Sequence, residues 1–275
     1  MKKYIIKFIG SYLNILSFIS ADYAARKALD IFATPRKGRL NAKHIATLKS
    51  AKKIKLKHEE HNIMTYHWQG QKATVLLVHG WESNTARWHN NIEHLTKQDY
   101  NIIALDAPAH GASDGNFFNA LLYAEFINVV AQKHQPDIII GHSVGGMASI
   151  FFQQKYQIDS IKKMVLLGAP SEFSGVLKNY TRLLGYNRKI EQQLDKIIIE
   201  RFGAAPNDFS ASKYAQDIEA QSLIIHDTED NIIPYSDAKL LNQGFKNSKI
   251  ITTKGFGHSL NNDSVSNYIL EFIKV

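Results

Sequence analysis

A buried strand that runs directly into a Gly-x-Ser-x-Gly motif is the feature that most constrains this chain. Residues 137–140 read Asp-Ile-Ile-Ile, residues 141–145 read Gly-His-Ser-Val-Gly, and helix-forming residues follow. This layout predicts that Ser143 lies on a tight turn between a strand and a helix, with its hydroxyl pushed out of the fold. Because few structural roles require a serine in that position, the segment indicates a reactive side chain.

Strands and helices alternate from about residue 54 onward. We expect a hairpin over 54–58 and 63–68, and apolar strands at 73–78, 101–105, 137–140, 164–167, 223–225 and 249–252. Helices are expected over 85–97, 118–134, 143–156, 235–245 and 265–273. Apolar strands that alternate with helices across short loops are typical of a mostly parallel, doubly wound α/β sheet. Chemistry in such sheets collects at the carboxyl ends of the strands.

One segment interrupts this alternation. Residues 171–216 follow a strand but contain about two helices, 177–184 and 191–202, before the next strand begins. We expect this insertion to form a helical cap, or lid, that excludes water and shapes a substrate pocket, rather than a decoration without a role. The predicted organisation is an N-terminal helical extension over 1–53 and a body over 54–275 that contains the lid.

Positive charge is concentrated in the N-terminal extension. Residues 1–60 contain 14 Lys and Arg against 4 Asp and Glu, whereas 61–275 contain 19 against 21. The near-neutral body argues against nucleic-acid binding, and the basic extension leaves open an attraction to an anionic surface.

The chain has no cysteine, which excludes disulfides, thiolate metal sites and cysteine nucleophiles. We expect no cofactor, no metal and a cytoplasmic location.

The first twenty residues have the pattern of an amphipathic helix. Polar residues recur at spacings of three and four, at Lys3, Lys7, Ser11, Asn14 and Ser17, and apolar residues occupy the other side. A membrane-spanning helix would not need this stripe, and no convincing signal-cleavage site follows. We expect the helix to pack on the protein's own body. Peripheral membrane contact through residues 1–20 is the alternative, and a secretion signal is the least favoured.

Three loops resemble those of the α/β-hydrolase superfamily. Val78-His79-Gly80-Trp81 is similar to the family's oxyanion-loop motif, residues 106–113 resemble its Asp-x-Pro-Gly-His-Gly-x-Ser loop, and residues 141–145 match its nucleophile elbow. The resemblance covers about 60–275 and implies an α/β-hydrolase fold. Ala109 stands where the family usually has glycine, so we expect a less tight turn there. The histidines of these loops, His79, His110 and His142, are expected to be structural.

The resemblance also implies an order of catalytic residues, namely serine, then an acid, then histidine. Ser143 is followed by Asp230 and then by His258, which lies in a glycine-rich loop after the last strand. Asp227 and Glu229 are alternative acids, but Asp230 fits the family's spacing to an apolar-Pro pair. The backbone N–H groups of Trp81 and Val144 are the implied oxyanion donors. A serine at the elbow argues against the relatives that use aspartate there, the haloalkane dehalogenases and epoxide hydrolases.

These residues imply hydrolysis of carboxylic esters or thioesters through an acyl-enzyme. Acyl transfer to an alcohol or amine on the same triad is one alternative, and a non-catalytic ligand-binding module on the same scaffold is another. The expected partner is a small-molecule or lipid-like ester. The apolar residues of the lid and of the N-terminal helix also suit a membrane-associated lipase.

Overall fold

A single eight-stranded sheet organises the larger of two units in the chain, with strand order β1-β2-β4-β3-β5-β6-β7-β8. The computed structural model describes residues 2–274. The strands are β1 (Lys52–His58), β2 (His61–Trp68), β3 (Lys72–Val78), β4 (Tyr100–Leu105), β5 (Ile138–His142), β6 (Lys163–Leu167), β7 (Gln221–Asp227) and β8 (Ser248–Thr253). β1 pairs antiparallel with β2 and β2 with β4, and all further pairs are parallel.

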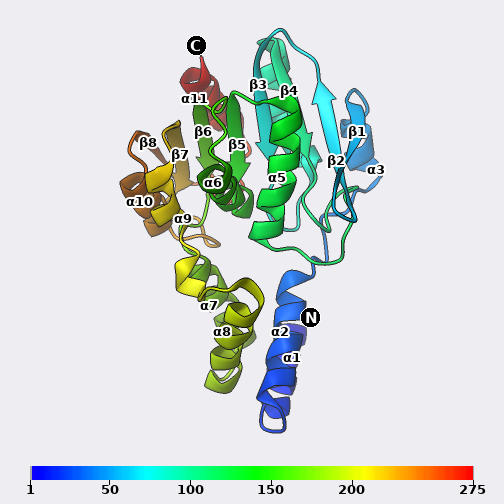
Figure 1. The fold of residues 1–275 in the computed structure, drawn as a ribbon, viewed down its shortest axis with the longest axis vertical. Helices are drawn as coiled ribbons and strands as arrows, with labels where there is room; N and C mark the ends of the chain where they lie inside the picture. The colour runs from blue at the N-terminus through cyan, green and yellow to red at the C-terminus, as the bar shows by residue number, and fades with distance from the viewer. Residues whose placement is uncertain (1, 275) are drawn as a thin grey trace. The chain divides into compact units, whose positions relative to one another are not determined.

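Helices cover both faces of this sheet (Figure 1). The helices α5 (Ala120–His134) and α6 (Val144–Tyr156) pack together on one face. On the other face, α4 (His89–Lys97) and α11 (Asp263–Ile273) join a common core with alternate residues of the strands. The prediction of a mostly parallel, doubly wound α/β fold is confirmed.

Burial on both faces explains why the central strands have continuous apolar sequences. Val75, Leu76, Leu77 and Val78 of β3 are all fully buried. Val75 and Leu77 belong to the core shared with α4 and α11. Successive side chains of a strand point to opposite faces, so Leu76 and Val78 pack on the opposite side. A one-sided sheet would have produced an alternating pattern instead.

Several short elements depart from the expectations. The helix predicted over 85–97 is a 3-10 turn, η1 (Thr85–Trp88), followed by α4, and a short helix, α3 (Ala42–Thr47), precedes the sheet. The remaining elements of this unit are α9 (Ala211–Tyr214), η3 (Ala215–Asp217) and α10 (Tyr235–Gly244). In α3 the Asn41 side chain accepts a hydrogen bond from the His44 amide, which is a helix N-cap.

The second unit is entirely helical and joins two distant parts of the sequence. It contains the residues up to Thr34 together with Glu172–Ser210. Its helices are α1 (Lys2–Leu16), α2 (Ala21–Ala33), α7 (Phe173–Leu184) and α8 (Arg188–Phe202), followed by the turn η2 (Pro206–Asp208). Residues 35–53 belong to the larger unit. The N-terminal extension is therefore divided, and its first two helices form one unit with the predicted lid.

Close packing and polar contacts hold this helical unit together. The α-carbon of Gly10 in α1 lies so near α7 that a Cβ there would be 1.7 Å from the Leu184 carbonyl oxygen. The Tyr180 hydroxyl donates a hydrogen bond to the Ala28 carbonyl of α2, at 2.7 Å. Its ring packs on Phe32 with the centroids 4.7 Å apart. Only glycine allows such an approach of two helix backbones.

The polar stripe of α1 makes hydrogen bonds within the helical unit. Asn14 accepts a hydrogen bond from the Asn187 amide, and Ser17 accepts one from the Asn187 side chain, at 2.8 and 2.9 Å. These polar residues therefore face the turn between α7 and α8. The opposite side of the helix carries exposed apolar residues, at positions 4, 5, 8, 12 and 15, and the turn after the helix carries two more, at 18 and 19. The side chain of Lys3 lies outside the described part of the structure.

Candidate active site

Ser143 occupies a strained turn between β5 and α6. Its backbone dihedrals are φ 53° and ψ −130°, values that a residue with a side chain rarely adopts. The turn is closely packed, because a Cβ on Gly145 would be 2.3 Å from the His79 carbonyl oxygen. The Ser143 amide donates to the carbonyl of Leu167, the last residue of β6, at 2.8 Å. The serine is thus fixed at the carboxyl ends of the central strands.

Three side chains from separate loops meet at this turn. His258, from the loop after β8, has its Nε2 atom 3.0 Å from the Ser143 hydroxyl oxygen. Its Nδ1 atom is 2.7 Å from a carboxylate oxygen of Asp230, which follows β7. Since a carboxylate only accepts, Nδ1 carries the proton and Nε2 is left free to accept the proton of the serine hydroxyl. The serine, histidine and acid named in the sequence analysis therefore lie in one hydrogen-bonded chain.

The environment of Asp230 favours its charged form. The carboxylate is fully buried. Burial is the largest influence and would raise the pKa of Asp230, but hydrogen bonds from His258 and from the Ile232 and Ile233 amides outweigh it and keep the pKa below its ordinary value. The charged carboxylate of Asp230 accepts the Nδ1 proton of His258. It thereby keeps this imidazole in the tautomer whose Nε2 atom carries no proton.

Asp227, the alternative acid, has another set of partners. It accepts hydrogen bonds from the Thr253 hydroxyl and the Phe256 amide with one oxygen, at 2.8 and 2.9 Å. The Glu229 amide donates to the other oxygen. Burial would raise the pKa of Asp227, and these hydrogen bonds lower it below its usual value. Asp227 therefore ties the loop of Asp230 to the loop that leads to His258.

Two neutral histidines hold the loop of residues 80–82. His79 donates through Nδ1 to the Gly80 carbonyl and accepts the Ala107 amide at Nε2, at 2.8 and 3.0 Å. His110 donates to the Pro108 carbonyl and accepts the Glu82 amide, at 2.7 and 3.0 Å. Burial lowers the pKa of both imidazoles, well below the ordinary range for His79. Each ring can fill both roles only while it is neutral.

The amides of Trp81 and Val144 belong to two segments that meet at Ser143. Trp81 follows the fixed residue Gly80, and Val144 is the first residue of α6, where helix N–H groups lack an internal partner. Within residues 2–274 neither amide donates a hydrogen bond to another part of the chain. A Cβ on Gly80 would lie 2.9 Å from the Ser143 Cβ, so the two segments are in close contact.

The expected loosening at Ala109 does not occur. Ala109 adopts φ 63°, the left-handed conformation that glycine reaches without strain. The turn is closed by hydrogen bonds from the Ala109 amide to the Asp114 carbonyl and from the His110 amide to the Ala107 carbonyl, at 2.8 and 3.1 Å. The surrounding loop therefore imposes the conformation on an alanine, and the prediction of a less tight turn was wrong.

Sequence reasoning missed Arg87, which supports the loop of His258. Its guanidinium donates to the Ser259 carbonyl at 2.8 Å, directly after His258. A lone arginine in η1 belongs to no motif, so only the fold reveals the contact.

No group of three or more His, Cys, Asp or Glu side chains that could hold a metal ion is found in the part of the chain that the structure describes.

Comparison with known protein families gives two matches. Residues 73–188 match the family model described as alpha/beta hydrolase fold, and residues 204–274 match a second model, TAP-like protein. The chain belongs to the α/β-hydrolase superfamily. It is a hydrolase-type enzyme by this membership.

Relatives of this hydrolase align over most of both chains. It is 22% identical to an AB hydrolase superfamily protein of Bacillus subtilis, over 74% of this chain and 91% of the relative. It is 23% identical to a bifunctional esterase/perhydrolase of Acinetobacter calcoaceticus, over 75% and 94%. The solved structure of a membrane phospholipase A, described as a bacterial virulence factor, is similar in fold, with a TM-score of 0.64 at 14% identity over 99% of this chain and 98% of that one.

Proposed function

We propose that this hydrolase cleaves carboxylic esters or thioesters of small or lipid-like molecules through an acyl-enzyme on Ser143. The observation that carries the proposal is the hydrogen-bonded chain from Ser143 through His258 to Asp230, with spacings of 3.0 and 2.7 Å. A relative named as an esterase supports the same reaction type.

The chemistry follows from the partners of each atom. As the Ser143 oxygen attacks the acyl carbon, His258 Nε2 takes its proton and then gives that proton to the leaving alcohol or thiol. Water attacks the acyl-enzyme next, His258 accepts the water's proton, and that proton returns to the serine oxygen as the acid departs. Asp230 keeps the imidazole in the required tautomer and stabilises it while it is charged.

The negative oxygen of each tetrahedral intermediate needs donors that are already in position. The Trp81 and Val144 amides are the proposed pair, since His79 and His110 fix the loop on both sides of residue 81. Donors that need not reorganise during the reaction stabilise the transition state more than water does. Loss of one such donor costs on the order of 100–1000-fold in rate.

We propose the inserted helices α7 and α8 as the lid of this site. The insertion leaves the body after Ser171, four residues beyond Leu167, whose carbonyl accepts the Ser143 amide. It returns at Ala211, whose amide donates to the Ser171 carbonyl at 2.8 Å. Both ends of the insertion are thus rooted just beyond the carboxyl end of β6, whose last residue accepts the Ser143 amide, and this is where a lid would act.

A panel of p-nitrophenyl esters and acyl thioesters of increasing chain length tests the proposed reaction. We expect turnover by the wild type and none above background by Ser143→Ala at equal thermal stability. Addition of a competing alcohol separates the alternative of acyl transfer, because a transferase would form the new ester at the expense of the free acid. Turnover that survives Ser143→Ala would contradict the proposal.

We also propose that α1 lies on an anionic lipid surface. Tyr4, Phe8 and Ile15 are between 69% and 79% exposed and lie on one face of the helix. Burial of such side chains is worth about 1.5–3 kcal/mol each. Lys7 is exposed beside them, as expected for contact with anionic headgroups. Within the described residues, no helix has the length and apolar character needed to cross a bilayer.

Co-sedimentation with phosphatidylglycerol vesicles tests this contact. We expect Phe8→Ser combined with Ile15→Ser to abolish sedimentation. The matched control is Ile45→Ser combined with Leu240→Ser, which removes two exposed apolar side chains of the larger unit, 50% and 41% exposed. If the α1 variant sediments as well as the control, the helix does not bind the surface.

A further inference from the structure

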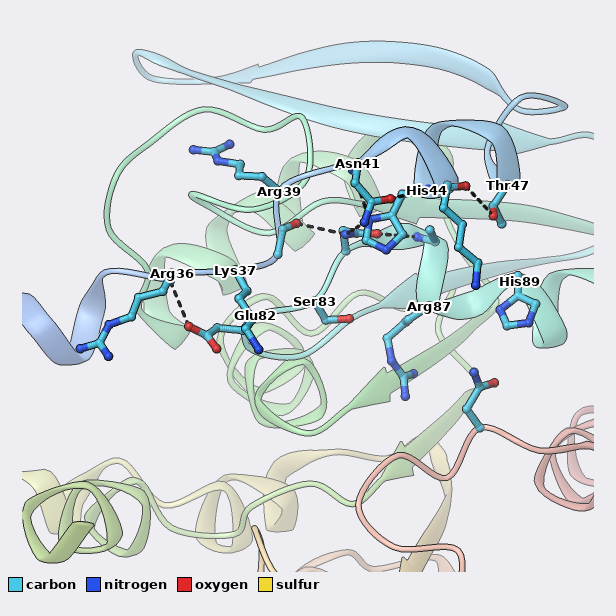
Figure 2. A pocket seen from close by; sticks show the side chains of 15 residues that line it. Arg36, Lys37, Arg39, Asn41, His44, Thr47, Glu82, Ser83, Arg87 and His89 are labelled. Carbon is cyan, nitrogen blue, oxygen red and sulfur yellow. Dashed lines mark hydrogen bonds between the residues drawn. The ribbon is translucent and has the colours of Figure 1, made fainter. Parts of the chain in front are cut away.

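A basic hollow lies in the larger unit, beside the loop that follows Trp81 (Figure 2). Its volume is about 690 Å³. Its lining contains the cations Arg36, Lys37, Arg39, Lys43 and Arg87 and one carboxylate, Glu82. A volume in this range is typical of sites for small molecules rather than for a single ion. The excess of positive charge favours an anionic occupant.

The one carboxylate does not neutralise the cations. Glu82 accepts a hydrogen bond from the backbone amide of Arg36 at 3.0 Å. Among residues 2–274 it forms no ion pair with Lys37, Lys43 or Arg87. Arg39 is engaged elsewhere, because its guanidinium donates to the Ser113 and Gly115 carbonyls.

Arg87 is the charge that most needs a partner. Its guanidinium packs over the Trp88 ring, 4.5 Å from the centroid, and donates to the Ser259 carbonyl. Burial lowers the pKa of Arg87 to about 9. A guanidinium has five N–H donors, so most of them remain available for an anion. Arg87 is half-buried and, within the described residues, has no carboxylate partner, so an anionic ligand would supply the missing opposite charge.

One uncharged side chain of the hollow, His44, can offer a donor to a ligand. His44 accepts a hydrogen bond at Nδ1 from the Asn84 side-chain amide, at 3.0 Å. The Nδ1 atom therefore carries no proton, and the Nε2 atom carries one and can donate. The same Asn84 amide donates to the Gly38 carbonyl and holds the loop of residues 36–41 against residues 82–84. The wall is thus fixed before a ligand arrives.

We propose that this hollow is a binding site for a phosphate-bearing ligand, either a soluble organic phosphate or the phosphate of a lipid headgroup. Arg87 would hold the phosphate oxygens with its planar N–H groups, and Lys37 and Lys43 would add charge from the rim. The volume beyond one phosphate would take a second phosphate or the organic part. None of these residues belongs to the triad, but Arg87 also donates to the Ser259 carbonyl beside His258, so binding is measured separately from turnover.

Calorimetric titration of the full chain with inorganic pyrophosphate tests the site, with sodium chloride at the same ionic strength as the blank. We expect saturable binding by the wild type. Lys37→Gln combined with Lys43→Gln should weaken it by about tenfold, and the matched control, Lys52→Gln combined with Lys53→Gln on the exposed edge strand β1, should leave it unchanged. Arg87→Lys, which keeps the charge but loses the planar fork, should also weaken binding.

Vesicles of phosphatidylcholine with and without phosphatidic acid identify the source of the phosphate. Binding to phosphatidic acid that pyrophosphate displaces, and that Lys37→Gln with Lys43→Gln weakens, indicates a lipid headgroup. Pyrophosphate binding without such displacement indicates a soluble phosphate. The proposal is overturned if the wild type binds neither probe, or if the control pair at 52 and 53 weakens binding as much as the pair at 37 and 43.

Discussion

The imidazole of His142 donates a hydrogen bond from Nε2 to the backbone carbonyl of His258, at 2.9 Å. The two rings lie 4.9 Å apart between centroids. The residue that precedes the nucleophile therefore holds the loop of the proposed base. Burial lowers the pKa of His142 well below its ordinary range, so the ring remains neutral near pH 7. His142 is a positioning residue, and it does not touch the reacting atoms.

Loss of this contact should slow turnover while leaving the nucleophile intact. We expect His142→Leu to lower kcat by roughly 10- to 100-fold, because a small displacement of the base costs that much. His142→Gln keeps an N–H donor and should retain more activity. The measurement is kcat and KM for one ester, with thermal unfolding as a check of folding. Equal loss in both variants would show that the hydrogen bond is not the relevant feature.

The two buried aspartates near the site should respond differently to the same change. Asp230→Asn should lower kcat by about 1,000- to 10,000-fold, because the amide favours the wrong tautomer of His258. Asp227→Asn should lower kcat less than about tenfold and instead reduce the free energy of unfolding by about 1–3 kcal/mol, since it disturbs three hydrogen bonds of a buried group. Steady-state kinetics and urea unfolding of both variants give the comparison. The reverse pattern would identify Asp227 as the catalytic acid.

Continuous apolar sequences predicted the central strands of the larger unit because those strands are buried on both faces. Continuous apolar runs such as 73–78 have few other stable arrangements in a chain of this size. The helical unit was harder to predict. Asn14 and Ser17 form a polar stripe that suggests a solvent-facing side, yet they bond Asn187, far along the chain. A pattern within one helix carries no information about a polar partner at that distance.

The site was predictable to the extent that motifs define it. Ser143, Asp230 and His258 follow from the elbow and from the order of the superfamily, and the structure brings them together. Arg87 and His142 act through backbone carbonyls of a loop over 100 residues away, at Ser259 and His258. A backbone acceptor exists at every residue, so no residue type marks such a contact in the sequence.

Glycine at position 109 should relieve local strain. Ala109 and Ala107 are both almost fully buried, and only Ala109 has a positive φ. Each change to glycine loses one buried methyl group. Only Ala109→Gly also removes an alanine from the left-handed conformation, and that conformation costs an alanine about 1–2 kcal/mol. We expect Ala109→Gly to be more stable than Ala107→Gly by that amount, measured by urea unfolding. If the two variants are equally stable, the conformation at 109 carries no strain.

Acid should weaken the fold through the buried histidines. Burial lowers the pKa of His79 well below the ordinary value of 6.5 that an unfolded chain has. The unfolded chain then binds more protons than the folded protein below that value, and stability falls as the pH drops from about 7 to about 5. His79→Gln should flatten this dependence in thermal unfolding scans. A slope that is unchanged in the variant would assign the effect to other groups.

The most direct test of the account is the reaction of the full chain with a fluorophosphonate probe, followed by mass spectrometry of the labelled peptide. The account predicts one covalent adduct, on Ser143, which is absent in Ser143→Ala and forms far more slowly in folded His258→Ala. A folded wild-type protein that takes no label, or a label on another residue, would contradict the claim that Ser143 is an activated nucleophile.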